Sequence, residues 1–263
     1  MAALWICCAA AGVTAVAQSK PQEKQSTNEA QLAKAHKMYY SATRDGLTGF
    51  DCAAHPEWRT TFMDARGGKL TEDDVRKIAA LQTVKIVLHG RLKGQSSLEW
   101  VETDPSSTQA FADVLKSMHE SLEQTLMGFM QFWVPFIDAQ VIPESSEGLT
   151  ITHTDDGGIT VRGGDAETSV TEIFDANLIL RHYNVKMKNA QVLFDPIFTP
   201  TAKGLRVSYF VAHLRQGENA EQEMHVGVTY GETGGFPVPV QMDMEVIGTG
   251  HVNVTMDGCV VNP

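Results

Sequence analysis

The sequence predicts an α+β fold in which a strongly curved antiparallel β-meander, an unclosed barrel, wraps around helices from the N-terminal half. From Gly148 onward, apolar and polar residues alternate in runs of roughly six to ten, which is typical of strands with one buried face. Glycine-containing turns, such as those at 155–158 and 231–235, separate these runs and supply the positive φ angles of tight hairpins. Before Pro143, apolar residues recur at helical spacing in several segments, so helices are available to cover the sheet.

The N-terminal segment has the features of a signal peptide. Residues 2–16 are apolar or small and uncharged, and they form a stretch too short to span a membrane. A small-x-small pattern at residues 15–17 precedes a polar stretch, as at a cleavage site. We therefore expect a signal peptide over 1–17, a disordered tract over 18–27, and a protein that is periplasmic or secreted.

Export changes what the cysteines imply. Cys7 and Cys8 leave with the signal peptide, and the mature chain keeps Cys52 and Cys259. Two cysteines in an oxidising compartment predict one disulfide, and two unrelated buried thiols are the alternative. Cys7 also allows a second interpretation, a lipid anchor, although Ile6 occupies the position where a lipid-attachment motif has a small residue.

No linker-like sequence interrupts the chain after residue 30, so we expect a single domain over 28–263. Helical periodicity predicts helices over 28–43, 71–81 and 107–133, the second with an N-terminal cap formed by Thr71 and Asp74. Pro135 is expected to end or kink the third helix. Alternation predicts extended segments at 47–63, 84–92, 97–102, 149–154, 159–162, 169–174, 178–187, 190–198, 205–214, 222–230, 238–246 and 252–261.

The third helix is the segment most suggestive of a binding site. Its second half is apolar on nearly all sides, so that it is either a central core helix or the wall of a lipid cavity. Late strands contribute methionines, whose flexible side chains suit adaptable apolar sites as well as irregular cores. The predicted lining residues are Phe129, Met130, Trp133 and Phe136 of the helix and Phe210, Met242 and Met244 of the sheet.

Little in the sequence indicates catalysis or a cofactor. The net charge of −11 argues against a nucleic-acid partner, whose phosphates are bound by Lys and Arg. The nine histidines are scattered singly, without the paired spacings of metal sites, and no GxSxG nucleophile elbow or phosphate-binding loop is present. We therefore expect a protein that is not an enzyme, with no metal and no cofactor.

Short patterns near both ends of the chain are similar to those of a known family. Residues 37–40 lead into the segment 47–52 (Leu-Thr-Gly-Phe-Asp-Cys), and residues 234–239 (Gly-Gly-Phe-Pro-Val-Pro) precede a final strand that ends at Cys259 and residues 260–262. This layout resembles the periplasmic carriers that sort outer-membrane lipoproteins, together with their lipid-binding relatives. The resemblance implies an unclosed barrel that shelters acyl chains and an arginine that holds a lid shut, for which Arg59 and Arg91 are the candidates.

The function that we expect is that of an exported carrier which shelters acyl chains in an apolar cavity between sheet and helices. Its partners would be a lipid acyl chain or a lipidated protein and, transiently, another protein of the cell envelope. Two alternatives remain: a non-catalytic structural or interaction protein of the envelope with a filled core, and a hydrolase with a dispersed active site.

Overall fold

The structure, a computed structural model, describes residues 22–103 and 109–263, so the predicted signal peptide and Cys7 lie outside the described residues. The chain forms two compact units. The first unit contains residues 22–40 and 139–225, and the second contains residues 41–138 and 226–263. We expected one domain because no linker is visible. The chain passes between the units at 40–41, 138–139 and 225–226, and these crossings have no linker composition that could mark them.

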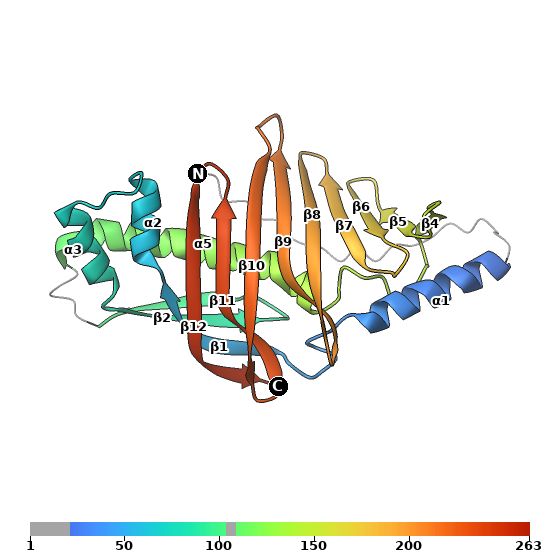
Figure 1. The fold of residues 1–263 in the computed structure, drawn as a ribbon, viewed down its shortest axis with the longest axis horizontal. Coiled ribbons are helices and arrows are strands. Elements are labelled where there is room, and N and C mark those ends of the chain that lie inside the picture. The colour runs from blue at the N-terminus through green and yellow to red at the C-terminus, as the bar shows by residue number, and fades with distance from the viewer. Residues whose placement is uncertain (1–21, 104–108) are drawn as a thin grey trace. The chain divides into compact units, whose positions relative to one another are not determined.

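The second unit combines helices with strands from both ends of the chain. α5 is its longest helix, and Figure 1 shows its length in green. In chain order the elements are β1 (Gly49–Pro56), α2 (Trp58–Ala65), α3 (Glu72–Leu81), β2 (Val84–Arg91), β3 (Ser97–Glu102), the 3₁₀ turn η1 (Gln109–Phe111), α5 (Ala112–Ile137), β11 (Phe236–Val246) and β12 (Gly250–Asn262). The core contains the buried stripe of α5 and inward-facing strand residues such as Leu88 and Met256.

In its described residues, the first unit consists of one helix and a run of hairpins. Its elements are α1 (Gln22–Met38), β4 (Thr150–His153), β5 (Ile159–Gly164), β6 (Thr168–Phe174), β7 (Leu180–Met187), β8 (Ala190–Thr201) and β9 (Gly204–Gln216). β10 (Gln222–Thr233) begins in this unit and continues into the second. The buried Tyr39 hydroxyl donates to the Leu178 carbonyl (3.2 Å) and accepts from the Leu180 amide (2.6 Å), which fixes the end of α1.

The strands are hydrogen-bonded in the order β3-β2-β1-β12-β11-β10-β9-β8-β7-β6-β5-β4. Neighbours along this order run antiparallel, and each hairpin of the meander pairs sequential strands. Within the described residues, the end strands β3 and β4 do not pair with each other, so the sheet is open. The predicted α+β fold with an unclosed antiparallel meander is therefore confirmed.

Several element boundaries differ from the sequence prediction. α1 begins at Gln22, so residues 22–27 of the expected disordered tract are helical; good helix formers there continue into the helix without Gly or Pro. The segment 47–63 is not extended throughout. β1 ends at Pro56, which has no N–H for the ladder, and Trp58 and Phe62 lie four residues apart on α2.

Pro135 does not end α5, which continues to Ile137. A proline inside a helix leaves the carbonyl four residues earlier without its usual donor. In α5 that residue is Gln131, which is exposed, so water can satisfy this carbonyl. By contrast, the predicted cap of α3 is confirmed: the Thr71 hydroxyl accepts from the Asp74 amide, and Asp74 reaches back to the Thr71 amide.

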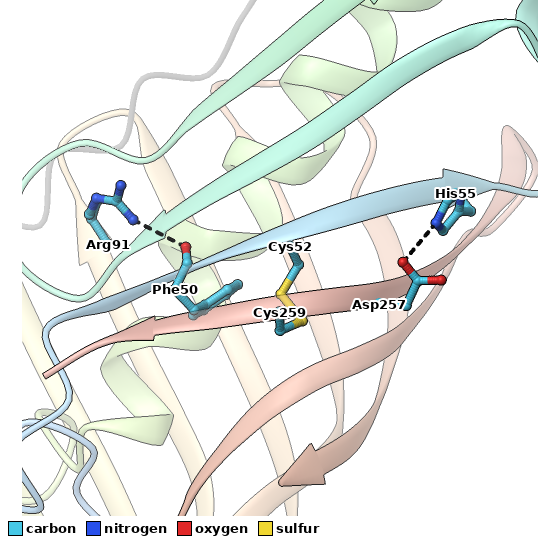
Figure 2. Close-up of a disulfide and its surroundings, with 6 residues drawn as sticks. All are labelled: Phe50, Cys52, His55, Arg91, Asp257 and Cys259. Atoms are coloured by element: carbon cyan, nitrogen blue, oxygen red, sulfur yellow. Dashed lines mark hydrogen bonds and ion pairs between the residues drawn. A yellow bond between two sulfur atoms is a disulfide. The ribbon is translucent and has the colours of Figure 1, made fainter. Parts of the chain in front are cut away.

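The predicted disulfide is present and joins β1 to β12 (Figure 2). Cys52 and Cys259 are 207 residues apart in the sequence and 4.1 Å apart at Cα. Along the same two strands, the His55 ring lies 3.1 Å from an Asp257 carboxylate oxygen. The C-terminal strand is thus linked covalently to the first strand of the second unit.

Candidate functional site

The strongest candidate site surrounds Trp133 on the second half of α5. The Trp133 side chain is fully buried and stacks on Phe129, with ring centroids 5.8 Å apart and planes at 21°. Phe50 of β1 meets the same ring edge-on at 6.1 Å. The indole N–H donates to the Tyr230 hydroxyl of β10 at 2.7 Å. An indole in an apolar core needs such an acceptor, and here the protein supplies it.

The other predicted residues of the second unit are also buried. Met130 and Phe136 of α5 are 3% and 2% exposed, and Met242 and Met244 of β11 are 0% and 7% exposed. The two methionines lie two residues apart, so they share the inner face of β11. The structure therefore gathers six of the seven predicted residues in the core of one unit.

Phe210, the seventh predicted residue, belongs to the first unit. It lies on β9, is fully buried, and packs edge-on against Phe194 of β8 with ring centroids 5.8 Å apart. It is therefore a core residue of a different unit from the Trp133 cluster.

Two contributors to the cluster were missed by sequence reasoning. Phe50 and Tyr230 come from β1 and β10, and only the fold brings them to Trp133. Gly90 of β2 gives the one local signal. A Cβ at Gly90 would lie 2.4 Å from the Phe50 ring, so only glycine leaves room for this aromatic side chain. A glycine within a predicted strand indicates such a close approach.

The chemistry of the Trp133 cluster is that of apolar contact. The six predicted residues of this unit carry no ionisable group. The indole N–H of Trp133 and the hydroxyl of Tyr230 are hydrogen-bonded to each other. The cluster can bury hydrocarbon, and the Tyr230 hydroxyl, its titratable group, accepts the Trp133 indole N–H. Methionine side chains on β11 and α5 make its surface deformable.

Of the two arginines suggested for a lid, Arg91 takes part in a polar network on β1 and β2. Its guanidinium donates to the Phe50 carbonyl (3.1 Å; Figure 2) and to the Asp51 carboxylate (2.9 Å). Asp51 also contacts His89 at 2.7 Å and accepts from Asn262 at 3.2 Å. Burial raises the pKa of Asp51, but these hydrogen bonds outweigh it and leave the pKa below its ordinary value.

Arg59, the other candidate, is exposed on α2. Arg91 therefore holds neighbouring strands of the second unit together, and its contacts are those of a structural residue.

The histidines pair with acids across the strands and loops of each unit. Seven of the nine lie within 4.0 Å of a carboxylate, which accounts for their scattered positions: His36, His55, His89, His182, His213, His225 and His251. Within residues 22–103 and 109–263, no group of three or more metal-ligating side chains could hold a metal ion. In the same residues, no helix has both the length and the apolar character needed to cross a membrane.

The second unit also has a polar surface cleft of about 370 Å³. It lies between α3 and the start of α5 and is lined by residues that include Asp73, Lys77, Phe111 and Asp113. None of the predicted site residues lines this cleft, and its walls differ in chemistry from the apolar cluster around Trp133.

Comparison with known proteins gave no relatives: no protein-family model, curated protein or solved structure matches the chain.

Proposed function

We propose that the protein is an exported carrier whose second unit shelters an acyl chain, from a lipid or a lipidated protein, against the second half of α5. The observation that carries this proposal is the apolar circumference of the helix. From Leu126 to Ile137, the side chain of Gln131 alone is exposed, and all the others are buried or half-buried. A helix so apolar has to be covered on several sides.

Methionines support an adaptable lining. Met130 of α5 and Met242 and Met244 of β11 are unbranched and can change rotamer to admit a chain of variable shape. Burying an acyl chain contributes about 0.8 kcal/mol per CH₂, so a short stretch of covered hydrocarbon gives useful affinity. Because Trp133 is enclosed by Phe129, Phe50 and Tyr230, the ligand would have to replace some of these contacts.

Export is supported by the disulfide and by the sequence of residues 1–17. A structural disulfide persists in oxidising compartments and is rare in reducing ones. The resemblance of the chain ends to lipoprotein-sorting carriers supports an acyl chain as the cargo. The disulfide and the sequence of residues 1–17 together support a periplasmic or secreted location.

The enclosure of Trp133 also favours a second candidate function. An exported envelope scaffold with a filled core would show the same buried residues and the same Trp133–Tyr230 hydrogen bond. It would bind no lipid. The two functions therefore differ in one measurable property, the presence of an acyl chain at the Trp133 cluster.

Native mass spectrometry of the protein, purified without detergent from its own compartment, tests the proposal first. A carrier is expected to retain lipid as discrete mass adducts. The matched variants are Met244→Phe, which fills the proposed lining, and Ile247→Phe at an exposed position of the same unit. The first should lose the adducts, and the second should keep them.

Fluorescence quenching by dibrominated stearate locates the chain. If the acyl chain lies at the cluster, bromine quenches Trp133, and the Trp133→Phe variant, which keeps Trp58 and Trp100, loses most of the quenching. A protein free of lipid that shows no quenching by the brominated acid would instead support the filled scaffold.

A further inference from the structure

The first unit contains a buried carboxyl group with one oxygen that has no hydrogen-bond partner among the described residues. Glu172 of β6 is 7% exposed, and its Oε2 atom makes no hydrogen bond to any described residue. An unpaired polar atom in a protein interior costs free energy, so a native structure that keeps one generally has a reason.

The other buried acids of the described residues are satisfied by the protein. Asp74 is bound by Thr71 and Arg66, and Asp138 accepts from Ser41 and Thr43. Glu172 is thus the exception among the buried carboxyl groups of this part of the chain. Among these acids, Glu172 is therefore the one left available to a ligand.

The strands around Glu172 present apolar and aromatic groups to it. Val161 of β5 and Tyr183 of β7 are its direct cross-strand neighbours, and Val170 and Phe174 lie on the same face of β6. The nearby cations Arg162 and Lys186 lie opposite Thr171 and Ser169 in the strand register. These side chains point to the other face of the sheet, because successive strand residues alternate between faces. On β5, β6 and β7, therefore, no charged side chain faces the Glu172 carboxyl.

An aromatic row continues the same face away from Glu172. The direct partner of Tyr183 on β8 is Phe194, with ring centroids 6.1 Å apart. Tyr183 is half-buried, as are Val170 and Val185, which are paired with each other beside it. The face is thus accessible next to the carboxyl. A carboxyl group bordered by aromatic rings and aliphatic side chains matches a cation attached to a hydrocarbon body.

We propose that Glu172 anchors a second binding site, on this face of the first unit, for a small amphiphile that carries a primary ammonium group on an alkyl chain. The ammonium donates to the Glu172 carboxylate and approaches the Tyr183 ring, and the alkyl chain covers Val170 and Val185. This site is separate from the acyl-chain site proposed at Trp133, and it takes a ligand of different charge.

The protonation of Glu172 provides a signature of such binding. Burial raises the pKa of Glu172 to about 8, so the free carboxyl is mostly protonated at pH 7. An ammonium ion beside it favours the carboxylate, and the carboxyl proton passes to the buffer. Binding at pH 7 therefore releases up to about one proton for each ligand bound.

Calorimetric titration with decylamine, below its aggregation concentration, tests the site. In two buffers of different ionisation enthalpy, wild-type protein should bind decylamine and release the proton. Glu172→Gln keeps the shape but removes the charge, and it should weaken binding by at least about tenfold and abolish proton release. Glu167→Gln, at an exposed position before β6, makes the same charge change and should alter neither.

Decanol and decanoate serve as probes with the same number of carbons. Equal affinity for decanol and decylamine, or a Glu172→Gln protein that binds decylamine as tightly as wild type, would overturn the proposal. Quenching of Trp133 by dibrominated stearate should be the same in Glu172→Gln and wild type. Failure of the ammonium site and failure of the acyl-chain site are thus measured separately.

Discussion

The two units treat their buried carboxyl groups in opposite ways. In the second unit, one oxygen of Asp138 accepts from the Ser41 hydroxyl (2.9 Å), the Thr43 amide (2.8 Å) and the Thr43 hydroxyl (2.6 Å). In the first unit, Glu172 is buried as deeply, with no partner for Oε2 among the described residues. A paired buried acid stabilises a fold, whereas an unpaired one destabilises it unless it is neutral or bound to a ligand.

The difference extends to how strands are held. The second unit joins its first and last strands by the Cys52–Cys259 bond and by the network around Asp51. The first unit relies on hairpin pairing and on the Tyr39 hydroxyl beneath Leu178 and Leu180. We infer that the second unit is built for fixed geometry and that the first retains a polar group for recognition.

The largest effect is expected from removing the disulfide. Replacing Cys52 and Cys259 by Ser opens a loop of 207 residues and should lower the free energy of unfolding by about 2–5 kcal/mol. Urea unfolding of the variant, with reduced wild-type protein as the control, measures this. If the urea midpoint of the variant were unchanged, the disulfide would not stabilise the second unit, and this difference between the two units would disappear.

Asp138→Ala is expected to cost about 3 kcal/mol, because the Ser41 and Thr43 donors then lack their acceptor. Asp138→Asn keeps an acceptor oxygen and should cost less. Thermal and urea unfolding of both variants give the two values. If Asp138→Ala and Asp138→Asn both lowered the free energy of unfolding only slightly, the paired Asp138 carboxylate would not stabilise the second unit.

Glu172 should give the protein an unusual pH dependence. Its pKa is raised from the ordinary 4.5 to about 8, so the folded state binds the proton more tightly than the unfolded state. The contribution of protonated Glu172 to the free energy of unfolding is therefore fully present below pH 4.5 and is lost as pH rises toward 8. The loss is at most about 1.4 kcal/mol per pH unit, or roughly 2 kcal/mol between pH 5.5 and 7.5.

Urea unfolding curves between pH 5.5 and 7.5 should show that the stability of Glu172→Gln does not fall as pH rises. At pH 7.5, this variant should be more stable than wild type. A wild-type profile parallel to that of Glu172→Gln would mean that the carboxyl is paired in solution, and the contrast between the units would disappear.

The smallest effect is expected at Gly128 of α5. An added Cβ meets nothing within 4 Å there, so Gly128→Ala should raise the free energy of unfolding by up to about 1 kcal/mol through helix propensity. Gly90→Ala is the contrasting control, because its Cβ would meet the Phe50 ring and should destabilise the protein. Urea unfolding measures the change in free energy of unfolding for both variants. Destabilisation by Gly128→Ala would show that other atoms of the protein cover α5 at this position.

Local patterns predicted much of the secondary structure. Alternation located the strands of the meander, and the Thr71–Asp74 spacing located the start of α3, because each depends on neighbours close in the chain. Some misplaced boundaries lay where a longer-range contact decided. The Tyr40 amide, for example, bonds to the Leu205 carbonyl at 2.9 Å, and α1 ends before it at Met38 instead of at residue 43.

The candidate sites were only half visible in the sequence. The apolar character of α5 identified Phe129 and Trp133, but Phe50 and Tyr230 come from strands far away in the chain. Glu172 could not be distinguished from the other acids, because its isolation depends on what the neighbouring strands place opposite it.

The sequence by itself determined the α+β class, the succession of hairpins and the two cysteines available for a bond, since periodicity and turn chemistry act over a few residues. The tertiary structure alone decided the division into two units, the enclosure of Trp133 and the unpaired state of Glu172. These features depend on strand register and on burial, because a side chain acquires a partner, or lacks one, only when distant segments meet.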